Sequence, residues 1–285
     1  MSDTAPQKSP DHVEEDQITE EERVEAATLT KLKPRMVYEI IRQEGRAEIS
    51  RPQASIWWSG IAAGICISMS LAMEAMLRTG LPDTDWRPLI ENFGYSAGFL
   101  IVMLGRMQLF TENTVTAVLP TLADPCRKTI LGTARLWSTV FIANMVGTLF
   151  AAAFIAYGGT LEPDVKKAAV EIGAHVAEWG ALETFLKAIP AGFLVAALVW
   201  MRPGSEGNEF WVILFFTYLI ALGDFAHVVV GSAELFLVGL EGEAGFAKLI
   251  FVNLLPALFG NILGGAGLFA MLAWGQVHEE IEDAD

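Results

Sequence analysis

Ionisable residues interrupt two apolar segments of the sequence, near the depth where a membrane helix would reach the middle of the bilayer. Arg106 and Glu112 lie in the first segment, and Asp224 and His227 lie in the second. A charge at the centre of a lone membrane helix costs about 2.5–3.5 kcal/mol. Non-helical backbone survives at that depth only where it faces protein or water. The pattern therefore predicts that both segments break and line a polar passage.

His227 carries the side chain best suited to acid–base chemistry, because imidazole changes its charge near neutral pH. The remaining histidines fall in polar flanks or in a predicted loop: His12, His175 and His278. One hypothesis is that a small carboxylate takes a proton at His227 and crosses apolar constrictions as a neutral acid, since a bare anion leaves water only at a large cost in free energy. The alternative is a histidine that serves only the packed interior.

The charged side chains Arg106 and Asp224 occupy matching places in the two interrupted segments. Two arrangements are open. The two residues could form a direct ion pair that neutralises both charges and fixes the loops, or each could pair locally, for example Arg106 with Glu112. In either arrangement these charges stabilise the loops.

Six apolar segments are candidates to span a bilayer, which requires about 20 residues each. They cover residues 56–77, 91–122, 136–157, 183–201, 210–239 and 250–274. Asn144 to Gly147 is echoed 117 residues later by Asn261 to Gly264. We therefore predict an all-α membrane protein of six transmembrane helices, built as two inverted three-helix repeats with helices two and five broken at the midplane, an aquaporin-like arrangement.

Both predicted breaks have expected boundaries. In the first, we expect a loop over 106–113 and a half-helix over 114–122, with Thr111 or Asn113 as its cap. In the second, Gly223 frees the backbone and Gly231-Ser232 opens the half-helix. Two half-helix N-termini that meet at the midplane present positive dipole ends, so the passage suits an anion.

The distribution of basic residues predicts the orientation. They gather before the first span and between the second and third: Lys31, Lys33, Arg35, Arg42, Arg46, Arg51, Arg127, Lys128 and Arg135. The positive-inside rule then places both termini in the cytoplasm. We divide the chain into a disordered acidic tail (1–34), an amphipathic cytoplasmic helix (35–55), a six-span channel domain (56–277) and an acidic C-terminal tail (278–285).

Composition excludes several function classes. A hydrophobic fraction of 53% with a mean hydropathy of +0.41 is typical of a membrane protein. The net charge of −15 arises mostly in tails and loops, and nothing favours nucleic-acid binding. Cys66 and Cys126 are too few for a disulfide or metal framework, so we expect free thiols and no metal or cofactor. A haem enzyme would need deep histidines that face one another.

The chain resembles the formate/nitrite transporter (FNT) family of pentameric channels in four motifs that follow the family's order. They are Leu109-Phe110-Thr111-Glu112-Asn113-Thr114, Leu198-Val199-Trp200-Met201, Phe225-Ala226-His227, and Asn253-Leu254-Leu255-Pro256 with Gly260-Asn261-Ile262-Leu263-Gly264-Gly265. The similarity spans residues 35 to 277 and is greatest to the family's YfdC-like branch. It implies a homopentamer with one pore per protomer, for small monovalent anions, in the bacterial inner membrane.

The resemblance also implies roles for single residues. His227 would be the central pore histidine, and Thr111 would lie on the loop beside the pore. The remaining pore positions implied in this way are Leu109, Phe99, Asn113, Tyr95 and Ile220.

Four positions depart from the family pattern: Gln108 and Ala226 replace acids, Gly231 replaces an asparagine, and Val176 stands where a vestibule lysine is usual. These departures keep open a divergent member that passes a neutral small solute or has a structural role.

Overall fold

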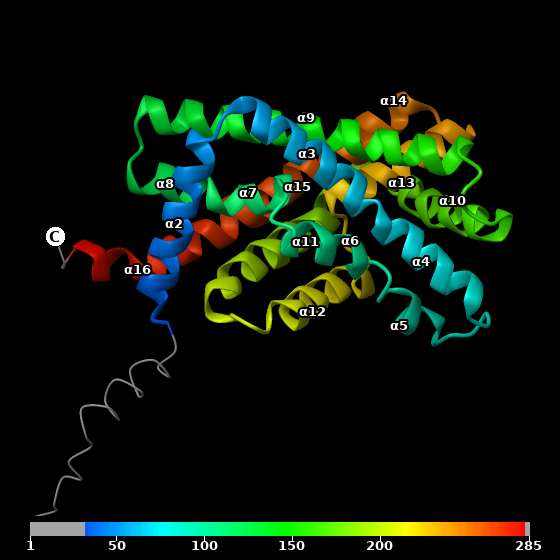
Figure 1. The fold of residues 1–285 in the computed structure, drawn as a ribbon, viewed down its shortest axis with the longest axis horizontal. Helices are drawn as coiled ribbons and strands as arrows, with labels where there is room; N and C mark the ends of the chain where they lie inside the picture. Colours follow the sequence, from blue (N-terminus) through cyan, green and yellow to red (C-terminus); the bar gives the residue numbers. More distant parts are fainter. Residues whose placement is uncertain (1–31, 283–285) are drawn as a thin grey trace, which may run out of the picture. The chain divides into compact units, whose positions relative to one another are not determined.

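Apolar periodicity and interrupted segments produce a structure made of helices (Figure 1). The computed structural model describes residues 32–282, and all regular structure within that range is helical. The helices are α2 (Pro34–Ser50), α3 (Gln53–Ile67), α4 (Met69–Gly80), α5 (Arg87–Glu91), α6 (Ser96–Leu104), α7 (Phe110–Thr116), α8 (Val118–Ala123), α9 (Arg127–Tyr157), α10 (Pro163–Glu178), α11 (Ala181–Met201), α12 (Glu209–Leu222), α13 (Val228–Glu241), α14 (Phe246–Lys248), α15 (Leu255–Ile262) and α16 (Met271–Glu282).

Within the described residues, four helical runs are long and apolar enough to cross a bilayer. They are Gln53–Gly80, Arg127–Tyr157, Ala181–Gly204 and Phe246–Glu280, and the last contains the π-helical stretches Leu249–Leu254 and Leu263–Ala270. The other two crossings are split, into α6 with α7 and into α12 with α13. The long runs extend beyond the predicted apolar segments, because a helix continues past the bilayer where its residues are polar.

The break between α6 and α7 covers residues 105–109, so the predicted loop over 106–113 ended too late. Leu109 is the N-cap of α7 and makes no side-chain cap. Neither Thr111 nor Asn113 caps the helix, and both lie inside it. The amide of Phe110 instead donates to Asn144 Oδ1 on α9 at 2.9 Å, so a neighbouring helix supplies the acceptor.

The break between α12 and α13 repeats this arrangement. Helix α13 begins at Val228 and not at Gly231-Ser232, so that predicted start was also wrong. The amide of Val228 donates to Asn261 Oδ1 at 2.8 Å, and the side chain of His227 caps the amide of Val230. In both breaks, the acceptor that fixes the start of the half-helix comes from tertiary structure.

Asn144 and Asn261 show the repeat most clearly, because each joins three chain segments with one amide. Asn144 Nδ2 donates to the carbonyls of Gly60 at 2.8 Å and Gln108 at 2.9 Å. Asn261 Nδ2 donates to the carbonyls of Ala188 at 2.8 Å and Ala226 at 2.9 Å. Buried backbone polar groups need such partners. The two halves therefore hold their broken helices by the same device.

Backbone conformation at the two breaks also matches. Arg106 has φ of 50° and Asp224 has φ of 53°, and they are the non-glycine residues with positive φ in the described chain. The backbone amide of the next residue donates to the carbonyl five residues earlier in both breaks. Met107 N–H donates to the carbonyl of Val102 at 3.0 Å, and Phe225 N–H donates to the carbonyl of Ile220 at 3.0 Å. The chain ends α6 and α12 in the same left-handed turn.

Helix α10 was missed, because residues 158–182 were taken as a loop between spans. Its buried residues, which include Ala169 and Ile172, pack on α4 and α13 in a second, smaller apolar cluster. Hydrophobic residues on one stripe of a helix give no long apolar run, so a search for spans passes over them.

Helix α2 covers most of the predicted amphipathic segment and ends at Ser50, before Pro52 begins the turn into α3. Its N-terminal end lies beside the C-terminal helix, where Arg35 Nη1 donates to the carbonyl of Glu280 at 3.2 Å (Figure 1). The predicted N-terminal tail lies almost wholly outside the described residues, and α16 runs through 278–282.

Candidate functional site

Thr111 and His227 meet where the two broken helices converge. Thr111 Oγ1 and His227 Nε2 are 2.7 Å apart, and the residues are 0% and 2% exposed. His227 Nδ1 accepts the amide of Val230 at 3.2 Å. Because a backbone amide can only donate, Nδ1 carries no proton, and the neutral ring holds its proton on Nε2. The imidazole therefore donates to the threonine hydroxyl.

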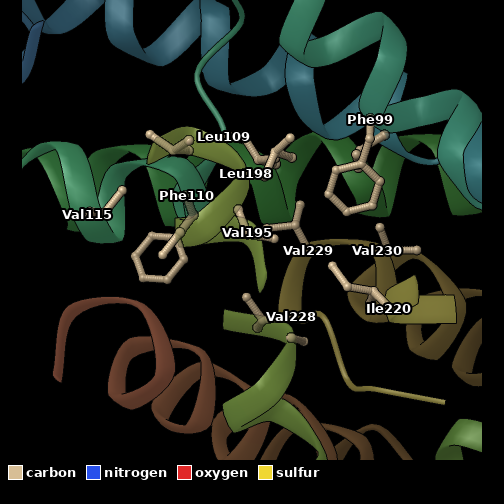
Figure 2. Packing of buried hydrophobic residues seen from close by; sticks show 14 of the residues in the cluster. Phe99, Leu109, Phe110, Val115, Val195, Leu198, Ile220, Val228, Val229 and Val230 are labelled. Carbon is tan, nitrogen blue, oxygen red and sulfur yellow. The ribbon is translucent and has the colours of Figure 1, made fainter. Parts of the chain in front are cut away.

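Apolar side chains surround this hydrogen bond. The ring of Phe99 lies edge-on to the imidazole with centroids 4.9 Å apart, and Tyr95 follows at 5.5 Å from Phe99. Leu109 and Ile220 are fully buried in the same cluster (Figure 2). An ion that enters such a contact pays a large free-energy cost for losing its water, whereas the cost for a small neutral molecule is much smaller. We call the contact of Thr111, His227 and Phe99 the waist.

A cavity of about 440 Å³ opens on the His227 side of the waist. We call it the larger vestibule. Its wall includes Tyr95, His227, Asp224, Glu74, Glu234 and Glu91. Tyr95 is 7% exposed, so it forms part of the cavity wall and does not protrude into solvent.

A second cavity, of about 170 Å³, opens on the Leu109 side. We call it the smaller vestibule. Here Gln108 Nε2 donates to Glu48 Oε2 at 2.7 Å, and Asn113 Nδ2 donates to Gln108 Oε1 at 3.1 Å. Position 108 lacks the carboxylate usual in the family, and Glu48 on α2 places one within hydrogen-bond distance of the Gln108 side chain. Leu109 lines this cavity at the position that His227 holds in the other repeat.

The predicted pair of Arg106 with Asp224 is wrong, and so is the alternative of Arg106 with Glu112. Asp224 Oδ2 accepts from Lys187 Nζ at 2.6 Å, and Glu112 Oε1 accepts from Arg202 Nη1 at 2.9 Å. Arg106 lines the smaller vestibule and Asp224 the larger one. Inverted repeats place equivalent residues on opposite sides of the waist, so matching positions cannot meet.

The left-handed turns yield a stability prediction. Glycine relieves the roughly 1–2 kcal/mol that an L-residue loses at positive φ, less about 0.5–1 kcal/mol of chain entropy. Arg106 is exposed and has no ion pair within residues 32–282, so Arg106→Gly should raise the melting temperature slightly. Asp224→Gly should lower it, because Lys187 loses its carboxylate. Thermal unfolding in detergent measures both, and shifts of the same sign would contradict this account.

Lys187 is the main residue that sequence reasoning missed at the site. Its ammonium also lies 4.6 Å from the ring centre of Trp179, and Asp224 is 3.3 Å from His175 Nε2. Val176, where the family usually has a lysine, lies on α10, and the ammonium beside Asp224 comes instead from Lys187 on α11. A lone lysine inside the apolar segment 183–201 was the available signal.

Comparison with known proteins agrees with this geometry. The family model described as Formate/nitrite transporter matches residues 35–275. The chain is 38% identical over 247 residues to the inner membrane protein YfdC of Escherichia coli, covering 87% of this chain and 80% of that protein. It is 24% identical to the formate channel BtFdhC of Bacillus thuringiensis, over 82% of this chain and 92% of that protein.

Two solved structures share the fold. An FNT family ion channel superposes with a TM-score of 0.73 at 22% identity, covering 84% of this chain and 96% of that one. A pentameric formate channel with formate bound gives 0.68 at 19% identity, covering 80% and 98%. With six crossings, two of them broken around one waist, this multi-pass membrane protein belongs to the formate/nitrite transporter family of transporters and channels, which are not enzymes.

Proposed function

We propose that this chain carries small monovalent anions of weak acids, such as formate or nitrite, together with a proton. The observation that carries the proposal is the hydrogen bond between Thr111 and His227 at the waist. A hydroxyl and an imidazole N–H can form hydrogen bonds with a carboxylate and also with its neutral acid. The apolar wall around them favours the neutral form. Transport as the acid moves one proton with each anion.

The waist geometry sharpens the role of His227. Its Nε2 proton is engaged by Thr111, and its Nδ1 accepts the amide of Val230. The ring can offer the Nε2 proton as a hydrogen bond to a passing oxygen without transferring it. Uptake of a second proton at Nδ1 would displace the helix cap. We therefore assign His227 to binding, with Thr111, and place the source of the proton elsewhere.

We propose the orientation from the basic residues of the chain and the assembly from the description of a solved structure with the same fold. The smaller vestibule lies beside α2, whose basic residues favour the cytoplasmic side. The larger vestibule then faces outward across the bacterial inner membrane. A solved relative by fold is described as a pentameric channel, so we propose a homopentamer with one passage per protomer. Mass measurement of the purified protein in its detergent shell tests the pentamer directly.

Flux measurements in proteoliposomes test the substrate class. We expect formate and nitrite to enter faster at low external pH, with alkalinisation outside as protons follow the anions inward. Glycerol and urea, which do not ionise as acids in this pH range, should enter no faster than they enter protein-free vesicles. Rapid entry of these neutral solutes without formate flux would instead establish the neutral-solute alternative, which the changes at Gln108, Ala226 and Gly231 favour.

A further inference from the structure

Two carboxyl groups in the larger vestibule have no role in the waist. Glu74 on α4 and Glu234 on α13 both line this cavity, and they are 9% and 5% exposed. Neither has an ion pair or side-chain hydrogen bond within the described residues 32–282. Glu234 follows His227 by seven residues, which is two turns and about 10 Å along one helix face.

The other charges in this vestibule are paired. Arg87 binds Glu91 at 3.0 Å, Arg78 lies 3.8 Å from Glu171, and Lys187 binds Asp224 at 2.6 Å, with His175 beside Asp224. The wall also includes the titratable residues Tyr95 and His227 and the uncharged polar residues Asn92, Thr184 and Asn253. The two unpaired carboxyls therefore leave a surplus of acids on the route to the waist. Such a surplus of acids draws protons rather than anions into the vestibule.

A buried carboxyl without a basic partner needs a cation to offset its charge. The cavity is open to solvent at the side away from the waist, so a proton is always at hand. We propose that Glu74 and Glu234 form a proton-holding filter: they hold protons in the vestibule and hand one to each anion of a weak acid before the waist. This inference rests on the proposed function and names the proton source that function needs.

The transfer step balances without any further reactant. The O–H bond of one glutamic acid breaks as an O–H bond forms on the carboxylate or nitrite oxygen. The glutamate left behind takes a proton from hydronium in the vestibule. The neutral acid then passes Tyr95 and reaches the hydrogen-bonding groups of Thr111 and His227. A strong acid anion, such as nitrate, cannot keep the proton and remains outside.

Nitrite and nitrate make a matched pair of probes, since both are small, planar and monovalent but only nitrite forms a weak acid. In proteoliposomes we expect wild-type protein to admit nitrite with one proton and to exclude nitrate. The double variant Glu74→Gln with Glu234→Gln should lose its acceleration at low external pH. It should still exclude nitrate, because nitrate forms no neutral acid that could enter the apolar waist.

Glu171→Gln is the control, since Glu171 lines the same vestibule but is paired and half exposed. It should keep both the pH profile and the exclusion of nitrate. If the double variant retains the wild-type pH profile, or if the wild-type protein carries nitrate as fast as nitrite, the filter is refuted. If wild-type protein moves neither formate nor nitrite, the proposed function fails instead.

A chemical test avoids dependence on variants that might not assemble. Dicyclohexylcarbodiimide adds to protonated carboxyls in apolar surroundings. We expect peptide mass spectrometry of the treated wild-type protein to find the adduct on Glu74 or Glu234, with nitrite flux lost in proportion. Adducts confined to other acids, or full labelling with unchanged flux, would overturn the assignment.

Discussion

Replacement of Thr111 by valine should reduce formate flux by about 10- to 100-fold while leaving the protein folded. Valine keeps the shape of threonine but removes one of the two hydrogen-bonding groups at the waist. A lost partner in a buried site costs about 1–3 kcal/mol, and each 1.4 kcal/mol corresponds to about a tenfold change. Initial rates of labelled formate uptake into proteoliposomes measure the loss.

Thr111→Ser restores the hydroxyl and should recover flux to within a few-fold of wild type. Thr114→Val is the matched control, because Thr114 is also buried on α7 but its hydroxyl donates only to the carbonyl of Thr111 at 2.7 Å. Wild-type flux through the Thr111→Val variant would show that the waist hydroxyl does not contact the substrate. Equal losses of flux in Thr111→Val, Thr111→Ser and Thr114→Val would show the same.

Replacement of Asn261 by alanine should prevent stable assembly. The change leaves the carbonyl of Ala226 and the amide of Val228 buried without their partner, and it removes the hydrogen bond to the carbonyl of Ala188 on α11. Each such group costs about 1–3 kcal/mol, and together they hold the break of the fifth crossing. Asn144→Ala should be equally damaging, because Asn144 makes the same three bonds in the other half. Yield of oligomer in size-exclusion chromatography reports the effect.

Asn253→Ala provides the comparison for these variants. Asn253 is also a buried asparagine of the sixth crossing, but within residues 32–282 it donates only to the carbonyls of Val176 and Trp179, and its own Oδ1 has no partner there. We expect a clearly smaller loss of oligomer. A similar yield for all three alanine variants would contradict the anchoring role given to Asn144 and Asn261.

Sequence reasoning located the waist because its polar residues lie in apolar segments. His227 was recognisable as the one histidine at membrane depth, and the motif around Thr111 marked the partner break. The repeat of Asn144 in Asn261 indicated two similar halves. These signals are local in the chain, so they survive without coordinates.

The helix starts at both breaks were misplaced for a physical reason. Cap propensities favoured Thr111 and Gly231-Ser232, whereas side chains from distant helices set the starts at Phe110 and Val228. Tertiary hydrogen bonds overrode the local preference. Those bonds cannot be predicted from the broken segment alone, because their acceptors lie on other helices.

The predicted ion pair of Arg106 with Asp224 was wrong because inversion of the repeats places these two matching residues on opposite sides of the waist. Once the halves are known to be inverted, Arg106 and Asp224 must face different vestibules. Lys187, Glu74 and Glu234 were visible as single charges in apolar segments, but their partners, or lack of partners, depend on packing. Burial without a basic neighbour emerges only in three dimensions.

The central claim is that one waist separates two vestibules and that all flux crosses it. Single cysteines placed on either side test this, in a chain with Cys66 and Cys126 replaced by serine. Cys126 has to be removed because hydrogen bonds from Thr129 lower the pKa of its thiol, which makes it reactive. Leu222→Cys lies on the wall of the larger vestibule, and Met107→Cys lies on the wall of the smaller one.

A bulky thiol reagent that cannot cross membranes is added to one side of the proteoliposomes while formate flux is recorded. We predict that each cysteine reacts from one side only, the two from opposite sides, and that either adduct stops the flux. Labelling of one cysteine from both sides, or undiminished formate flux with both vestibules blocked, would contradict the account.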